Sequence, residues 1–484
     1  MTIAPERLSG STPQPRSRAA LASEHIADAA RTGRDVAGRS VSGRDVSIDA
    51  VRAMLLVAVV ALHAMMVGVS VGAGGPVLAN ALEQQAWFAP VSWIVQVMPL
   101  FFVIGGFASI SQWRGLRARG VSPASYVRGR IDRLVRPALA LVVVVGGALL
   151  ALAALGMPAE LVATAGFRIG QPLWFLGVYI LCSALVPLMV AAHERAKVAT
   201  PVLLLAAVVA VDVARLSSGI GAIGFLNLLF VWLLVQQLGF WLADGHVDAI
   251  APRARVGVII TALAALIALT AGPYPADMFV NLNPPTLCLV LLGAAQLMLF
   301  SLLRGRISAL AERPRARRAI DELGKRGMTV YIWHMPVLII LAAALLILNA
   351  TTGLALPEPL SAEWWSSRAL WLLIVGLAVT PVVSLFARFE RGRRPVSGAA
   401  LPTPRSVALD TVLGAGGVAV VLIAGFGPLP ASAALTMLLV ALLGSGRVGA
   451  ALRRAVPSVR TTTTSSTRMT GARPAGDAAA VAAS

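Results

Sequence analysis

Residues 49–63 read DAVRAMLLVAVVALH, an apolar run with an aspartate and an arginine at its start and a histidine deep inside. Arg52 and His63 are about three helical turns apart, so a helix would place both on one face, roughly 16 Å apart along its axis. Asp49 lies on the same face, at ion-pair spacing from Arg52. Ionisable side chains within a membrane helix are costly, so this stretch predicts a functional site.

The composition predicts that the whole chain is a membrane protein. Of its 484 residues, 57% are hydrophobic and 13% are charged, which is too apolar for a water-soluble globule. Many runs approach the roughly 20 apolar residues that cross a bilayer. These runs show no two-residue alternation, which favours helices over a β-barrel. We therefore expect an all-α polytopic membrane protein.

The net charge of +19 has an uneven distribution along the chain. Nearly all lysines and arginines fall in tails and loops that alternation of the spans places on one side, whereas the opposite loops contain only Arg168 and Arg215. This bias fixes the orientation of a membrane protein, with basic loops inside. We therefore expect both termini in the cytoplasm and no nucleic-acid partner.

The hydropathy pattern divides the chain into four parts. We expect a disordered cytoplasmic tail over 1–47, a membrane core over 48–390, an inner loop with an additional hydrophobic pair over 391–445, and a second disordered cytoplasmic tail over 446–484. The hydrophobic pair is either two short spans or a re-entrant hairpin. The core contains about ten spans, at 50–71, 91–112, 137–156, 172–191, 200–216, 223–243, 256–272, 286–303, 328–349 and 368–388.

Metal and cofactor chemistry has no clear signature in the sequence. Cys182 and Cys288 lie in apolar runs and are expected to be small buried hydrophobes. No CxxC, HExxH or Gly-rich phosphate loop is present. We expect no metal site and no tightly bound cofactor. His193 and His246 fall in basic loops and are expected to be solvated.

His63 is the strongest candidate for chemistry. A histidine suits the role of general base or nucleophile because its pKa lies near operating pH. The alternative is a neutral imidazole that is hydrogen-bonded between helices. Arg52 either binds an anion near the inner face or anchors the helix by its positive charge alone.

The stretch SIDAVRAMLLVAVVALHA (47–64) resembles the first helix of the acyltransferase-3 family of integral membrane acyltransferases, which carries an Asp, an Arg, ten residues and a His. Four later segments resemble family motifs in the same order: PLFFVIGGF (99–107), RGRIDRLVRP (128–137), PLWFLGVYIL (172–181) and TVYIWHMPV (329–337). One departure is Gly105, where the family usually has a serine. The last apolar pair and both tails lie outside the resemblance.

The resemblance implies an O-acyltransferase of the plasma membrane. Such an enzyme moves an acyl group, often acetyl, from cytoplasmic acyl-CoA as co-substrate to a hydroxyl of an acceptor. The acceptor would be a carbohydrate, as in polysaccharide modification by O-acetylation, or a glycosylated small molecule. Residues implied in this role are His63 as catalytic base or nucleophile, Arg52, Arg130 and Arg133 as donor-binding groups, and Asp49 and His334 as supporting groups.

The later assignments also have simpler alternatives; for His334 this is membership of an interfacial aromatic cluster. Arg130 and Arg133 would share a helical face if the third span began early, yet basic residues there also serve as topology signals. Asp49 either orients Arg52 or caps the start of the helix. For the whole chain, the alternative function is a proton-coupled secondary transporter, because an intramembrane Arg and His also suit proton coupling.

Overall fold

The computed structural model of the chain describes residues 45–72, 75–83, 85–390 and 401–444. The tail expected over 446–484 lies outside the described residues. The tail expected over 1–47 also lies outside them, except for its last three residues, where the first described helix begins.

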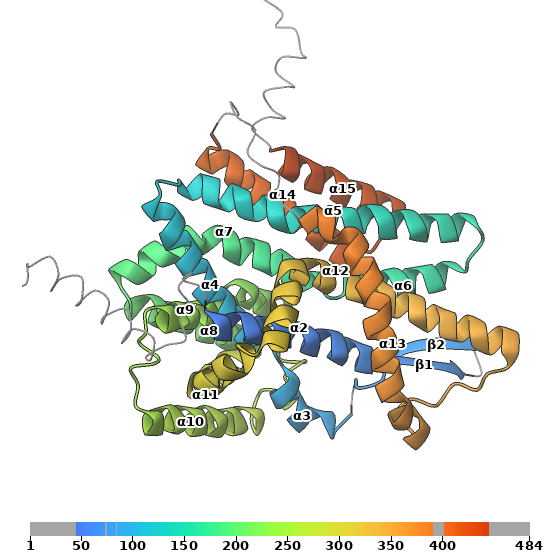
Figure 1. Ribbon diagram of the computed structural model, residues 1–484, viewed down its shortest axis with the longest axis horizontal. Coiled ribbons are helices and arrows are strands. Elements are labelled where there is room, and N and C mark those ends of the chain that lie inside the picture. The colour runs from blue at the N-terminus through green and yellow to red at the C-terminus, as the bar shows by residue number, and fades with distance from the viewer. Residues whose placement is uncertain (1–44, 73–74, 84, 391–400, 445–484) are drawn as a thin grey trace, which may run out of the picture.

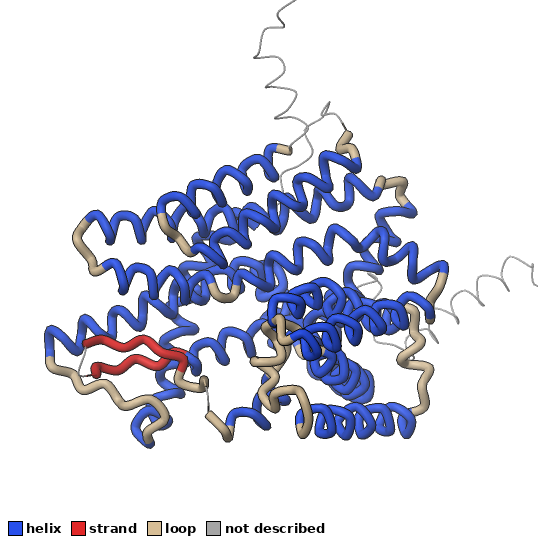
Figure 2. Tube along the Cα trace, turned by 180° about the vertical axis from the view of Figure 1, so that it is seen from behind, coloured by secondary structure: helices blue, strands red, loops and turns tan. Residues whose placement is uncertain are grey.

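The architecture is helical throughout the described ranges. Among the described residues, eleven helical segments are long and apolar enough to cross a membrane, which confirms the prediction of an all-α polytopic membrane protein. The only strands within these ranges form one antiparallel pair, β1 (Val67–Gly72) and β2 (Gly75–Asn80). Figure 2 shows this pair at one end of the molecule, beside the ends of helices.

The first helix, α2 (Val46–Met66), begins earlier and ends earlier than the expected span 50–71. The strand β1 takes up the end of that span. Next follow the short helix α3 (Phe88–Val95) and α4 (Met98–Ala118), separated by a break at Gln96 and Val97. His63 therefore lies one turn before the C-terminal end of α2.

The helix α5 (Pro123–Ala154) includes the arginine-rich segment that hydropathy assigns to a loop. Ser122 caps its N-terminus by accepting a hydrogen bond from the backbone N–H of Ser125, and Pro123 occupies the first turn. Pro137 consequently lies inside the helix and not at its start. The expected outer loop that follows contains another helix, α6 (Ala159–Gly170).

The remaining elements follow the predicted order of spans, with extended ends. They are α7 (Leu173–Arg195), α8 (Ala199–Ser218), η1 (Gly221–Leu226), α9 (Asn227–Ala243), α10 (Pro252–Thr270), α11 (Leu287–Ala311), α12 (Pro314–Thr352), α13 (Ala362–Phe386), η2 (Ala387–Glu390), α14 (Pro404–Ala424) and α15 (Pro428–Leu443). The terminal hydrophobic pair is thus two helices, of which α14 is long enough to cross a membrane and α15 is shorter.

Helices α4 and α9 approach each other closely through glycines. A Cβ atom at Gly239 would lie 2.0 Å from the carbonyl oxygen of Val103, and one at Gly106 would lie 2.3 Å from that of Gln236. Only glycine fits at such a contact, as is common where membrane helices pack backbone against backbone. This contact fixes α4, which lines one side of the site.

The hairpin α14–α15 packs against α5 and α7, and Figure 1 shows α14, α15 and α5 along one edge of the molecule. Arg128 on α5 links the two helices of the hairpin. Its guanidinium donates to the carboxylate of Asp410 at 3.0 Å and to the carbonyl of Ala441 at 2.7 Å. A cation at the C-terminal end of α15 also suits the helix dipole.

Candidate active site

A cavity of about 850 Å³ runs along α2, from Asp49 in the first turn to Met66 at the last residue. These residues are about 25 Å apart along the helix axis. Helices α2, α4, α5, α7 and α12 contribute to its wall. Arg52 and His63 both line this one cavity.

The end of the cavity near the start of α2 is basic. Arg52, Arg130 and Arg133 all line it, and the early start of α5 places the two later arginines on one face of that helix. Arg130 donates to the hydroxyls of Tyr179 at 3.0 Å and Ser183 at 3.3 Å. Its guanidinium carbon also lies 5.7 Å from the centre of the Tyr179 ring, a cation–π contact.

Glu390 of η2 also lines this end of the cavity. Its carboxylate accepts hydrogen bonds from the backbone N–H groups of Met328 and Thr329 and, at 2.8 Å, from the Thr329 hydroxyl. Arg133 lies 3.9 Å away. Beyond it a second cavity of about 470 Å³, here called the basic vestibule, is lined by Arg133, Glu322, Lys325, Arg326, Ala387 and Glu390.

Asp45, and not Asp49, caps the N-terminus of α2. Its carboxylate accepts from the backbone N–H groups of Ser47 and Ile48. Burial raises the pKa of this carboxyl, but the hydrogen bond with Ser47 and the charge of Arg304 outweigh burial and lower the pKa overall. Asp49 instead lies within the first turn and lines the cavity.

His63 and His334 are in direct contact, although they are far apart in sequence. Nδ1 of His63 lies 2.8 Å from Nε2 of His334, and the planes of the two rings differ by 23°, with their centroids 5.0 Å apart. His334 is fully buried on α12, and its Nδ1 lies 2.6 Å from the carbonyl oxygen of Tyr331. His63 lines the cavity and His334 supports it from behind.

Beyond His63 the cavity is lined mainly by neutral and aromatic side chains. Polar groups there come from the segments after β2 and α6 and before α11, namely Asn80, Glu83, Gln171 and Asn283. Aromatic side chains lie among them, namely Phe167, Trp174, Phe225 and Phe279. Leu422 and Ile423 of α14 complete the wall.

A family model described as an acyltransferase domain matches residues 45–396, which include both histidines and all three arginines of the cavity. The chain belongs to the acyltransferase-3 family. It is accordingly an acyltransferase of the multi-pass membrane class. No curated protein and no solved structure matches the chain.

Tyr179 is a residue of this acyltransferase that sequence reasoning did not single out. It lines the cavity, binds Arg130 and stacks on Phe175 with ring centroids 5.4 Å apart. A Cβ atom at Gly105, the position where the family usually has serine, would lie 3.7 Å from Cε2 of Tyr179. The sequence feature that could have pointed to Tyr179 is that it is the lone tyrosine in the apolar segment PLWFLGVYIL.

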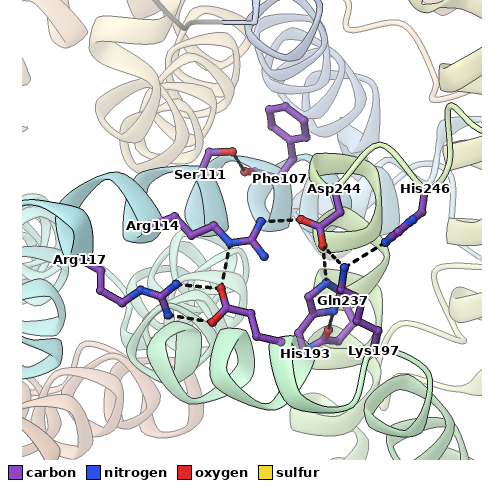
Figure 3. A network of polar contacts seen from close by, with 10 residues as sticks. Phe107, Ser111, Arg114, Arg117, His193, Lys197, Gln237, Asp244 and His246 are labelled. Atoms are coloured by element: carbon purple, nitrogen blue, oxygen red, sulfur yellow. Dashed lines mark hydrogen bonds and ion pairs between the residues drawn. The ribbon is translucent and has the colours of Figure 1, made fainter.

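His193 of the acyltransferase is fully buried, so the prediction that it is solvated was wrong. The reason is that α7 continues to Arg195, well past the apolar run. Figure 3 shows its surroundings. The His193 network consists of Arg114, Arg117, His193, Glu194, Lys197, Gln237 and Asp244, joined by hydrogen bonds and ion pairs. The His246 residue beside it is exposed, as expected.

Proposed function

We propose that this acyltransferase moves an acyl group, specifically acetyl, from acyl-CoA to a hydroxyl of a sugar-containing acceptor, with His63 as general base. The observation that carries the proposal is the single cavity that joins a basic end, His63 and a polar far end. In this proposal the donor and the acceptor enter at opposite ends of the cavity and meet at one imidazole.

The basic end suits the donor. Acyl-CoA is a polyanion, and arginines bind phosphates by charge and by paired hydrogen bonds. Arg52, Arg130 and Arg133 supply these groups inside the cavity, and the basic vestibule adds Lys325 and Arg326 outside it. The roughly 16 Å between Arg52 and His63 lets the anionic head stay at the entrance while the thioester reaches the histidine.

The far end suits an acceptor rich in hydroxyls. Amide and carboxylate side chains exchange hydrogen bonds with hydroxyl groups, and aromatic faces cover the apolar side of a sugar ring. Asn80, Glu83, Gln171 and Asn283 offer the first kind of contact. Trp174, which lines the same cavity, offers the second.

The proposed reaction is a direct displacement. His63 removes the proton of the acceptor hydroxyl as its oxygen attacks the thioester carbonyl. The new ester C–O bond forms and the C–S bond breaks, and the proton passes from His63 to the departing CoA thiolate. No metal and no tightly bound cofactor takes part in this scheme.

The orientation follows from the charge bias of the loops. The basic vestibule and the arginine-rich start of α5 face the cytoplasm in this scheme, together with both termini. Acyl-CoA then enters from the cytoplasm across the plasma membrane's inner face, and the acceptor enters from the opposite side.

The test uses inside-out membrane vesicles from a host that lacks its own copy of the gene. Vesicles containing the wild-type protein receive radiolabelled acetyl-CoA, and label is counted in products from which alkali releases acetate. We expect label with the wild type and with His246→Ala, the control that removes an exposed histidine, and none above background with His63→Ala. Equal labelling by His63→Ala would contradict the assignment of the base, and an acyl group found on His63 by mass spectrometry would replace the base with a nucleophile.

A further inference from the structure

The contact between His63 and His334 determines where the protons of both rings lie. Two imidazole nitrogens at 2.8 Å form a hydrogen bond only if one carries a hydrogen and the other is bare. The hydrogen positions can therefore be assigned from the other partners of the two rings.

The second nitrogen of His334 decides the assignment. Its Nδ1 lies 2.6 Å from the carbonyl oxygen of Tyr331, and a carbonyl oxygen only accepts. Nδ1 of His334 therefore carries the hydrogen, and Nε2 of the neutral ring is bare. It follows that His63 donates from Nδ1 to Nε2 of His334, which leaves Nε2 of His63 as the nitrogen with a free lone pair.

The free nitrogen belongs to the ring that the cavity reaches. His63 is partly exposed and lines the cavity, whereas His334 is fully buried. Among the described residues, none forms a hydrogen bond with Nε2 of His63. The lone pair is thus available to a molecule in the cavity.

The supporting ring is itself fixed in place. Tyr331, one turn before His334 on α12, donates its hydroxyl hydrogen to the carbonyl of Pro172 at the start of α7. Its ring also packs edge-on against Phe175, with centroids 5.0 Å apart. These contacts hold the turn of α12 that presents both the Tyr331 carbonyl and His334 to His63.

We infer that His334 is a positioning residue that holds His63 in the tautomer with hydrogen on Nδ1 and so presents the Nε2 lone pair to the acceptor hydroxyl. When His63 accepts the proton on Nε2, its bond from Nδ1 to His334 becomes charge-assisted and stronger. The proton can be shared along this bond with Nε2 of His334, but it is relayed no further, because the Tyr331 carbonyl that accepts from Nδ1 cannot take one up. The histidine pair retains it until His63 returns it to the departing thiolate.

The first experiment reads the tautomer directly and needs no acceptor. The full chain is produced with ¹⁵N-histidine, placed in lipid nanodiscs, and its five histidines are observed by NMR, with the His63 signals assigned from their loss in His63→Gln. We expect a protonated Nδ1 and a bare Nε2 on His63 in the wild type, and a mixture of both tautomers in His334→Ala. Hydrogen on Nε2 of His63 in the wild type overturns the inference.

The second experiment rests on the proposed function and measures acetyl transfer in the labelled-vesicle assay. We expect His334→Ala to lower turnover about 100-fold with KM for acetyl-CoA unchanged, because the base spends less time in the active tautomer and orientation. His334→Asn and His334→Gln should recover part of the loss, since an amide oxygen can accept from Nδ1 of His63. Only variants that purify as a single monodisperse species are compared.

The outcomes of the two experiments distinguish the positioning role of His334 from the proposed function. Full turnover in His334→Ala overturns the positioning role even if the tautomer is as assigned, and so does equal loss in the Ala, Asn and Gln variants. Full turnover in His63→Gln overturns the proposed function, while the NMR assignment of the His63 tautomer is unaffected by that result. Because residues that act as one unit are not additive, His63→Gln and its double variant with His334→Ala should be equally inactive.

Discussion

The cavity and the His193 network each contain a histidine and several arginines, yet the bonding of the two histidines differs. In the His193 network, Nδ1 of His193 contacts Gln237 at 3.0 Å and Nε2 contacts Asp244 at 3.2 Å, so both ring nitrogens have partners. His63 lines the cavity, one of its nitrogens is bonded to His334, and the other forms no hydrogen bond with the described residues. The proposed function assigns the role of base to this second nitrogen.

The arginines of the two regions also differ in their hydrogen-bond partners. Arg114 and Arg117 are paired with carboxylates, and Glu194 accepts from both. Arg130 donates to two neutral hydroxyls instead, and no carboxylate of the described residues pairs with it. The His193 network thus pairs its charges internally, whereas Arg130 keeps a positive charge that the proposed function assigns to donor binding. Four predictions test this contrast.

The largest expected effect comes from exchanging the two histidines for glutamine in separate variants. His63→Gln should lower acetyl transfer by at least about 100-fold, because glutamine cannot take up the proton, while the Tm of the purified protein stays the same. His193→Gln should do the reverse, lowering the Tm with turnover per folded molecule preserved. Acetyl-transfer assays and thermal unfolding of both variants test this prediction. A loss of turnover per folded molecule in His193→Gln would contradict the difference between the two histidines.

Arg130→Lys should raise the KM for acetyl-CoA about tenfold, because an ammonium group cannot offer the paired geometry of a guanidinium to a phosphate. The matched variant Tyr179→Phe removes the hydroxyl that holds Arg130 and retains the charge. We expect a smaller rise in KM from it. Equal effects of the two changes would mean that Arg130 acts by holding Tyr179 and not by binding the donor.

The basic vestibule should contribute a smaller, salt-dependent share of donor binding. Exchanging Lys325 and Arg326 together for glutamine should raise the KM for acetyl-CoA roughly threefold, and the rise should shrink at high ionic strength because salt screens exposed charges. Arg315 and Arg318 lie exposed on the same helix outside both cavities. Their double glutamine variant has the same change in charge and should leave the KM unaltered.

The lowered pKa of Asp244 predicts how the stability of the His193 network changes in acid. Burial raises the pKa of this carboxyl, but hydrogen bonds from Arg114, Lys197 and His193 outweigh burial and lower the pKa well below its usual value. Its interactions therefore contribute full stability above the unfolded-state pKa of about 3.9 and lose it as the pH falls through the folded-state value. We expect the Tm of the wild type to fall below about pH 4, and that of Asp244→Asn to be lower at neutral pH but to change less in acid.

The sequence was sufficient for the helical class and for the alignment of Arg52 with His63. Both follow from local rules, namely the length of apolar runs and the 3.6-residue period. The sequence did not reveal the contact of His63 with His334, because their distance in space depends on how α2 packs against α12. Tyr179 was missed for the same reason, since only the fold places its hydroxyl beside Arg130.

Hydropathy misplaced element boundaries wherever charges lie within helices. The segment around Arg128 reads as a loop because it is basic, yet Asp132 one turn later pairs with Arg128 at 2.8 Å and supports the helix. The opposite error occurs after Met66. There the apolar segment VGVSVG reads as the end of a span, whereas its pairing with β2 makes it a strand.

The family match ends at residue 396, but Leu422 and Ile423 beyond it line the far end of the cavity. Both residues lie on α14. Arg128 of α5, inside the matched region, forms hydrogen bonds with α14 through Asp410 and with α15 through the carbonyl of Ala441. The far end of the cavity is therefore formed mainly by the matched domain, and α14 adds two residues from outside it. In the proposed function these two residues border the acceptor, so changes in 404–443 are expected to alter the acceptor range while His63 and the arginines stay the same.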